Sequence, residues 1–366
     1  MKGIKIAIVG SRGIPARYGG FETFAERLAQ GLARRGHRVE VYCKSSLKTL
    51  PYQFERVERV FLRCPSMKSV EKLCLSNRGV LKALFRKNRV IVLLGVSGVP
   101  TGIFARALGT KIILNPDGLE WKRGKWNSLG RWLLRRLEAW GARIAHALVA
   151  DSRAIQDYLR RTYGKPAVFI PYGVDPPQED PEAWEDLRRR FSLEEYGYYL
   201  AVGRDVPENN FPMIVEGFLK SPSRRKLVVV SDAGENYRRF REREGVVFTG
   251  PIYRRRDLYA LRLHAFAHIH GHSVGGTNPS LLEAVACGNP VIAYDVVYNR
   301  EVLEEFGLYF STAEELAESI DIMEREGERI RKRAGEYYEK ILREKYNWEL
   351  VVEAYAGLVE KISREV

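Results

Sequence analysis

The sequence of 366 residues is poor in cysteine and has no long apolar run. Its four cysteines, Cys43, Cys64, Cys74 and Cys287, form no C-x-x-C pair and no Cys/His cluster with the spacing of metal ligands. The first residues lack the apolar core of a signal peptide, and no apolar stretch reaches the roughly 20 residues of a membrane-spanning helix. We therefore expect reduced cysteines, no metal site, a cytoplasmic location and no crossing of a membrane.

Signatures of two common ligand classes are also missing. No G-x-G-x-x-G motif follows the first apolar run, which disfavours a nicotinamide cofactor, and we expect no cofactor at all. No helix-turn-helix, zinc-finger or RNA-recognition signature accompanies the basic residues, so we expect no nucleic-acid partner. A basic nucleic-acid-binding protein nevertheless stays open as an alternative, because the chain is strongly cationic.

The net charge of +14 is unevenly distributed. Residues 1–175 contain 33 Lys and Arg against 12 Asp and Glu, whereas residues 176–366 contain 27 against 34. The positive field therefore belongs to the first half, and such a field favours an anionic partner. Arginine-rich helices that only keep the protein soluble are the alternative explanation.

The first half has the alternation of a parallel α/β domain. Residues 5–10 form an apolar run that ends on glycine, apolar residues at helical spacing follow, and residues 39–42 resume a strand. Such βαβ units place ligands at the carboxyl ends of parallel strands. Further buried strands are expected at residues 90–94, 111–114 and 147–150.

A proline-rich acidic stretch at residues 176–181 marks a domain boundary, and the second half then repeats the architecture of the first. Its strands are expected at residues 198–202, 227–230, 246–248, 267–270 and 291–294, and residues 330–365 read as helix. We therefore predict an α/β fold of two Rossmann-like domains facing across a cleft. The domains are residues 1–175 and 176–340, and residues 341–366 form a helix that returns to the N-terminal domain.

A glycine-rich loop joins the first strand to the first helix over residues 10–23. Gly19 and Gly20 have no Cβ atom, so a ligand can approach the backbone there. The helix that follows offers free N–H groups and the positive end of its dipole. These features suit a phosphate or a sugar, and a tight turn shaped by the glycines alone is the alternative.

The second motif spans residues 269–284. Asn278 is a suitable N-cap and Pro279 a suitable first residue of a helix. Residues 275–277 then lie just before the positive end of that helix, where a diphosphate can accept several backbone hydrogen bonds. Glu283, about one turn inward, can present its carboxylate to two neighbouring hydroxyls such as those of a ribose.

Two smaller signals accompany these motifs. Arg204 follows the strand at residues 198–202, where its guanidinium can neutralise a phosphate with two N–H groups, although an arginine after a glycine is common. His270 and His272 stand at alternate positions, but no third metal ligand is evident beside them.

Three segments, residues 11–23, 117–126 and 271–284, resemble the signatures of one known group. That group is the bacterial rhamnosyltransferase-like branch of the retaining GT-B glycosyltransferases of family 4, and the resemblance covers nearly the whole chain. It implies transfer of a sugar, with rhamnose suggested by the group, from a nucleoside-diphosphate sugar to a hydroxyl of a glycan or lipid-linked acceptor. Polysaccharide biosynthesis is the implied process.

The resemblance also implies roles for the two domains and for individual residues. The N-terminal domain is expected to bind the acceptor and the C-terminal domain the nucleotide sugar. Closure of the domains would bring the two substrates together. Asp117 and Glu22 are the expected catalytic residues. The expected donor-binding residues are Gly19, Gly20, Arg204, Asn209, His272, Gly275, Gly276, Thr277, Asn278 and Glu283, and the expected acceptor-binding residues are Arg12, Arg17, Tyr18 and Trp121.

Two positions differ from the general family. The family has two glutamates eight positions apart in the donor loop; Glu283 corresponds to the second, but Gly275 occupies the place of the first. An arginine and a lysine clamp the donor diphosphate in the family, and they correspond to Arg204 and Asn209 here. The rhamnosyltransferase-like group shares both departures, so backbone amides are expected to carry more of the phosphate charge. A catalytically inactive nucleotide-sugar sensor is an alternative.

The implied mechanism needs neither a metal nor a protein nucleophile. The acceptor attacks the same face through an oxocarbenium-like state, and the departing β-phosphate helps to take its proton, so catalysis is mostly positioning and phosphate stabilisation. The alternative enzyme is a non-hydrolysing sugar-nucleotide epimerase with Asp117, Glu22 and His272 as acid–base groups. For Asp117, an ordinary turn aspartate is a further alternative.

Tryptophans alternate with cations at residues 121–126 and 131–140. Tryptophan beside lysine and arginine suits an interface with anionic headgroups. We therefore expect peripheral attachment of the N-terminal domain to the inner face of the cell membrane. Tryptophans in the core with solvated cations around them are the alternative.

Overall fold

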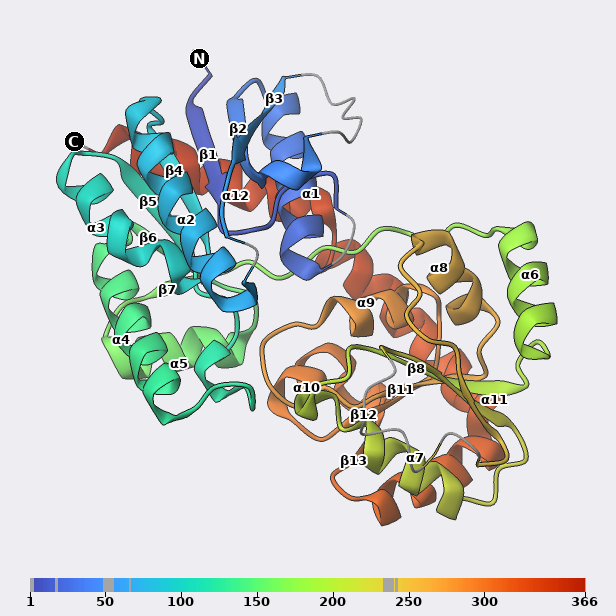
Figure 1. Ribbon diagram of the computed structural model, residues 1–366. Helices are drawn as coiled ribbons and strands as arrows, with labels where there is room; N and C mark the ends of the chain where they lie inside the picture. The colour runs from blue at the N-terminus through green and yellow to red at the C-terminus, as the bar shows by residue number, and fades with distance from the viewer. Residues whose placement is uncertain are drawn as a thin grey trace. The chain divides into compact units, whose positions relative to one another are not determined.

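The computed structural model describes residues 3–16, 19–48, 56–65, 67–232, 240 and 243–365. The chain forms two compact units, Met1–Gly173 with Trp348–Val366, and Val174–Asn347. Each unit is built around one parallel β-sheet with helices on both faces (Figure 1). The predicted α/β fold of two Rossmann-like domains is therefore confirmed.

The first unit has a seven-stranded parallel sheet in the order β3-β2-β1-β4-β5-β6-β7. Its strands are β1 (Lys5–Val9), β2 (Arg38–Lys44), β3 (Val57–Leu62), β4 (Val90–Leu94), β5 (Lys111–Asn115), β6 (Ala147–Ala150) and β7 (Ala167–Phe169). Its helices are α1 (Gly20–Arg34), α2 (Lys68–Phe85), α3 (Val99–Ala107), α4 (Ser128–Ile144), α5 (Arg153–Tyr163) and α12 (Trp348–Arg364). Right-handed crossovers place α1 on one face of the sheet and α2 to α5 on the other. Because α12 contacts α1, and α3 contacts both α2 and α4, the two helical layers are distinct (Figure 1).

The second unit has a six-stranded parallel sheet in the order β10-β9-β8-β11-β12-β13. Its strands are β8 (Tyr198–Val202), β9 (Lys226–Val230), β10 (Val246–Phe248), β11 (Ala267–His270), β12 (Val291–Tyr294) and β13 (Leu308–Phe310). Its helices are α6 (Pro181–Phe191), α7 (Phe211–Lys220), α8 (Arg255–Leu263), α9 (Pro279–Ala286), α10 (Val297–Leu303) and α11 (Ala313–Glu344). The sheet separates two apolar cores, because α7 and α11 cover one face while α6 and α8 cover the other. In both sheets the strand order places β1 and β8 in the interior, so the loops that follow them lie at the carboxyl edge where parallel sheets bind ligands.

The C-terminal end of the chain differs from the prediction. The expected continuous helix over residues 330–365 is interrupted, since α11 ends at Glu344 and α12 begins at Trp348. Residues 341–347 therefore belong to the second unit, and the return to the first unit begins at Trp348. A backbone hydrogen bond from Val174 N to Tyr346 O, 2.9 Å long, holds the interruption in place.

Helix α12 is anchored to α1 by close packing. A Cβ atom placed on Gly31 would lie 2.4 Å from the side chain of Val352, so only glycine permits this approach. The ring of Phe24 lies 5.4 Å from that of Tyr355, centroid to centroid. Packing against α1 therefore places α12 in the layer opposite α2, α3 and α4.

The expectation that all cysteines are reduced is wrong for two of them. Cys64, just after β3, and Cys74 on α2 form a disulfide bond. The two positions meet because the chain reverses direction between the end of the strand and the second turn of the helix. Cys43 and Cys287 stay free. Among the helices that the structure describes, none combines the length and apolar character that a bilayer-spanning segment needs.

Candidate functional site

The loop between β11 and α9 in the second unit has the predicted helix entrance. Asn278 caps α9, since its side-chain oxygen accepts a 2.8 Å hydrogen bond from Ser280 N, and Pro279 is the first helical residue. Gly275 has a φ of 145°, a conformation that residues with a Cβ atom rarely adopt. The local prediction for this segment is therefore confirmed, and Gly275, Gly276 and Thr277 approach the positive end of α9.

The neighbouring loop after β8 is tied to this entrance through His272. Its Nδ1 lies 2.9 Å from the side-chain oxygen of Asn209, and the Asn209 amide donates a 2.8 Å hydrogen bond to the carbonyl of Arg204. A Cβ atom placed on Gly275 would lie 3.2 Å from His272 Nε2. The structure thus brings together four of the predicted donor-binding residues, with the imidazole directed toward the glycine loop.

Further hydrogen bonds fix the two loops together. Asn210 donates to the carbonyl of Gly271 at 2.8 Å, and Ser273 N donates to the carbonyl of Glu208 at 2.9 Å. The side chain of Asn299, at the start of α10, donates to the carbonyl of His272 at 3.0 Å. Arg204 itself is exposed at the start of the loop that follows β8. These asparagines therefore bind loop backbone and the His272 side chain, and a phosphate-binding role for Asn209 stays a prediction.

Glu283 has a partner that sequence analysis missed. The guanidinium of Arg262, on α8, lies 2.7 Å from the Glu283 carboxylate and donates a 3.1 Å hydrogen bond to Ser280 Oγ. Only 1% of the Arg262 side chain is exposed, against 26% of Glu283. A buried cation needs a charged partner, so this pair holds the carboxylate at a fixed place on α9. Nothing in the amphipathic pattern of α8 marks residue 262 as functional.

Two buried histidines lie on β11 behind this pair. Burial lowers the pKa of His268 to about 3, with the nearby Arg262 acting in the same direction. Burial likewise holds the pKa of His270 well below its usual range, so both imidazoles are neutral. No cluster of three or more His, Cys, Asp or Glu side chains able to hold a metal occurs in the described part of the chain.

In the first unit, two glutamates of α1 hold the glycine-rich loop. Glu22 accepts a 2.9 Å hydrogen bond from Arg12 N, and Glu26 accepts one of 2.6 Å from Ala16 N. Gly19 has a φ of 107°, and a Cβ atom there would lie 2.4 Å from Glu22 Oε2. Glu22 thus supports the loop backbone beside Gly19, while Gly20 begins α1. Arg17 and Tyr18 lie outside the described residues.

Asp117 lies just beyond the carboxyl end of β5 in a left-handed conformation, with a φ of 70°. One carboxylate oxygen accepts a 3.0 Å hydrogen bond from Gly118 N, and the other lies 3.6 Å from Arg123. Asp117 also affects the buried side chain of Tyr172. Burial raises the pKa of the Tyr172 hydroxyl well above its usual range, and the negative charges of Asp117, Asp151 and Glu22 raise it further. Both predicted catalytic carboxylates therefore contribute to the electrostatic environment of one buried tyrosine.

Of the remaining expected acceptor residues, Arg12 is exposed and Trp121 is half-buried. Arg12 Nε lies 3.6 Å from the buried carboxylate of Glu71, which also pairs with Lys44 at 2.6 Å. Trp121 is half-buried, with its indole nitrogen inside the protein and the Arg135 guanidinium 4.8 Å from its ring centroid. Trp121 is thus held between other side chains, and an acceptor-binding role for it stays a prediction.

Comparisons with known proteins agree with this picture. Residues 4–175 match a family described as "Domain of unknown function (DUF1972)", and residues 197–324 match one described as "Glycosyl transferases group 1". A curated relative, an uncharacterized glycosyltransferase of Methanocaldococcus jannaschii, is 23% identical over 60% of this chain. The match spans 59% of the length of that relative.

Solved structures share the fold over almost the whole chain. A sucrose-phosphate synthase from Thermosynechococcus elongatus has a TM-score of 0.83 and 19% identity, covering 98% of this chain and 99% of its own. The Anabaena protein HepE in complex with UDP-glucose has a TM-score of 0.77 and 17% identity, covering 98% of this chain and 100% of its own. These comparisons support the two-domain GT-B glycosyltransferase architecture, and they favour neither an epimerase nor a nucleic-acid-binding protein.

Proposed function

We propose that the chain is a retaining glycosyltransferase that moves a sugar from a nucleoside-diphosphate sugar to an acceptor hydroxyl. The observation that carries the proposal is the Asn278-capped entrance of α9, which combines a glycine loop with a fixed carboxylate one turn inward. The match of residues 197–324 to the glycosyl transferases group 1 family supports it.

The diphosphate of the donor is the ligand that suits the N-terminal end of α9. Free N–H groups of a helix entrance and its partial positive charge stabilise a phosphate without a lysine. Arg204, at the end of β8, adds a cation that can contact phosphate oxygens in pairs. His272, held by Asn209, contributes a nitrogen directed at Gly275. These groups replace the family lysine, whose position Asn209 occupies.

The ribose hydroxyls are proposed to bind Glu283. A carboxylate that accepts from two neighbouring hydroxyls needs a fixed orientation, and the 2.7 Å contact with buried Arg262 provides one. Arg262 is then a positioning residue, because it acts on the donor only through Glu283.

Retention is proposed to occur without a protein nucleophile or a metal. The acceptor hydroxyl attacks the anomeric carbon on the face from which the diphosphate leaves, and the β-phosphate takes the proton of that hydroxyl. In this scheme Asp117 and Glu22 help to orient the acceptor and the sugar in the first unit. HepE is described in complex with UDP-glucose, which supports a nucleotide-sugar donor, and rhamnose is the first transferred sugar to test. The proposed acceptor is a glycan or lipid-linked glycan.

Thermal shift with UDP-, GDP-, dTDP- and ADP-sugars tests the donor site. We expect one diphosphate family to stabilise the wild type, and Arg204→Ala and Glu283→Gln to reduce that stabilisation. Arg224→Ala and Glu328→Gln, at exposed positions of the same unit, are matched controls. If no nucleotide sugar shifts the melting temperature, or if the controls lose the shift equally, the donor assignment is wrong.

A further inference from the structure

The layer formed by α2, α3 and α4 carries most of the exposed apolar side chains of the protein. Among the described residues, eighteen large apolar side chains are exposed, and twelve of them lie between residues 67 and 140. Phe85 is 81% exposed, Leu108 70%, Leu129 71% and Trp132 55%. We call the exposed side chains of residues 67–85, 103–108 and 129–143 the α2–α4 face. Such a concentration of apolar surface marks an interaction site rather than ordinary surface.

The same layer is cationic and presents no exposed carboxylate. Residues 67–144 contain sixteen Lys and Arg against four Asp and Glu. Glu71 and Glu120 are buried against cations, Glu138 is buried and accepts from two tyrosine hydroxyls, and Asp117 is partly buried beside Arg123. The opposite layer differs, since α12 exposes Glu349 and Glu353. The α2–α4 layer therefore exposes cations together with apolar side chains, whereas the opposite layer exposes charges of both signs, such as Arg34 and Glu353.

The spacing on α4 shows how the two kinds of side chain share one side of a helix. Five exposed side chains of α4 fall on one side of the helix, since each lies three or four residues from another: Leu129, Trp132, Leu133, Arg136 and Trp140. The Arg136 guanidinium lies 5.5 Å from the ring centroid of Trp132. Tryptophan rings with arginines beside them settle at the depth of lipid headgroups, with the rings in the apolar boundary and the charges on phosphates.

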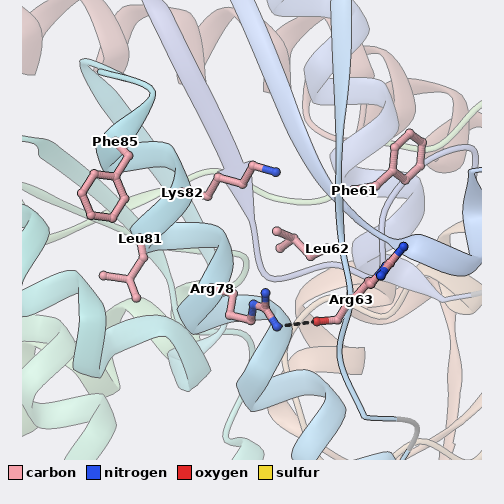
Figure 2. Close-up of a pocket in the computed structure, with 7 residues that line it drawn as sticks. All are labelled: Phe61, Leu62, Arg63, Arg78, Leu81, Lys82 and Phe85. Atoms are coloured by element: carbon pink, nitrogen blue, oxygen red, sulfur yellow. Dashed lines mark hydrogen bonds between the residues drawn. The ribbon is translucent and has the colours of Figure 1, made fainter.

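A pocket at the edge of this face has the same character. It encloses about 420 Å³ between the end of β3 and α2. Figure 2 shows Phe61, Leu81 and Phe85 around it, together with the cations Arg63, Arg78 and Lys82. Arg78 donates a 2.8 Å hydrogen bond to the backbone carbonyl of Arg63, which holds the Arg78 guanidinium against the end of β3. An apolar hollow rimmed by cations suits the phosphate and upper chain of one anionic lipid.

We propose that the α2–α4 face is a docking surface for an anionic lipid bilayer. The positive charge of the face favours a bilayer over a second copy of this chain, because a second copy would bring like charges together. An anionic bilayer instead attracts each nearby Lys or Arg by about 1 kcal/mol. The apolar side chains add binding by entering the headgroup boundary. Trp132 and Trp140 are the aromatic anchors, while half-buried Trp121 and Trp126 are not. The surface stands independently of the proposed sugar transfer.

Vesicle sedimentation with the full chain tests the proposal. The probe is a vesicle of phosphatidylglycerol and phosphatidylcholine in equal parts, and pure phosphatidylcholine is the neutral comparison. We expect sedimentation with the anionic vesicles only, weakened as salt screens the charges. The double variant Trp132→Ser with Arg136→Glu should reduce partition at least about tenfold, since it removes one anchor and reverses one charge.

The matched control is the double variant Leu350→Ser with Arg189→Glu, which makes the same kinds of change at exposed positions elsewhere. It should sediment as the wild type does, and both variants should keep the wild-type melting temperature. The proposal is overturned if the wild type stays in solution with anionic vesicles at low salt. It is equally overturned if both variants lose binding alike.

Discussion

Arg262 and Glu283 form an ion pair 2.7 Å long in which the cation is buried and the carboxylate reaches the surface. The two partners therefore differ in what their removal leaves behind. Without Glu283, the guanidinium stays inside the protein without its counter-charge, whereas without Arg262 the carboxylate can turn to solvent. Breaking a buried pair is costly mainly through the charge that is left unpaired.

This asymmetry predicts different stability losses for the two deletions. We expect Glu283→Ala to lower the free energy of unfolding by about 3 kcal/mol and Arg262→Met by roughly 1 kcal/mol. Urea denaturation of both variants measures the difference. The double variant should be more stable than Glu283→Ala alone, because it removes the stranded charge. Equal losses for the two single variants would contradict the proposed burial of charge.

A second prediction concerns the glycine loop before α9. Gly275→Ala should lower the free energy of unfolding by about 1–2 kcal/mol, since its φ of 145° disfavours a Cβ atom, and should weaken nucleotide-sugar binding. Gly335→Ala is the control, because its Cβ would meet nothing within 4 Å on the long helix α11. Alanine there should stabilise by up to about 1 kcal/mol. Thermal unfolding with and without donor separates the two effects.

A third prediction concerns acid stability through Glu40, which is buried on β2. Burial alone would raise the pKa of Glu40, but hydrogen bonds from Arg86, Asn88, Lys5 and Tyr42 outweigh it and hold the pKa at about 2. The carboxylate thus stabilises the fold fully above its unfolded pKa near 4.5, and this stabilisation is lost as the pH falls toward 2. Glu40→Gln should be less stable at neutral pH and show a shallower loss between these pH values.

Acid unfolding followed by circular dichroism measures that slope. A loss of stability in the same direction should persist in the Glu40→Gln variant, beginning as the pH falls below about 6.5. It comes from His268, whose pKa is lowered by burial to about 3 and which resists protonation only in the folded state. A Glu40→Gln variant with the same acid profile as the wild type would show that Glu40 is not the responsible carboxylate.

A fourth prediction concerns the cysteines. The Cys64–Cys74 bond closes a short loop, and its removal by reductant or by Cys64→Ser with Cys74→Ser should cost roughly 2–3 kcal/mol. Thiol labelling of the folded, unreduced protein should be slow. Burial raises the pKa of Cys43 to about 11 and that of Cys287 to about 12, which suppresses their reactive thiolates. Rapid labelling before reduction would mean that the bond is absent in solution.

Local signals explain which parts of the structure were predictable. The entrance of α9 follows from Asn278 and Pro279, which act within a few residues, and strands such as 198–202 and 267–270 follow from short apolar runs. The contact between Arg262 and Glu283 joins two helices, and no periodicity marks it. The Cys64–Cys74 bond was missed for the same reason, because it depends on where a strand end and a helix meet.

The tryptophans show that neighbouring basic residues do not predict whether an aromatic side chain is exposed. Trp121 and Trp132 look alike in sequence, each beside basic residues, yet one is half-buried and the other exposed. The difference arises because Trp121 lies in a turn covered by α4, whereas Trp132 lies on the outer side of that helix. The position of each tryptophan relative to α4, and not the composition of the segment, determines which side chain is exposed for binding.

The second unit is an insertion in the first, since the chain enters it at Val174 and leaves it at Asn347. These two residues form an isolated parallel bridge, so the ends of the inserted unit are adjacent. A gene fragment for residues 174–347 therefore encodes an uninterrupted module, whereas the first unit requires a short artificial linker from residue 173 to residue 348. The second unit is accordingly the part that can be exchanged between relatives as a cassette, with both junctions made at one place.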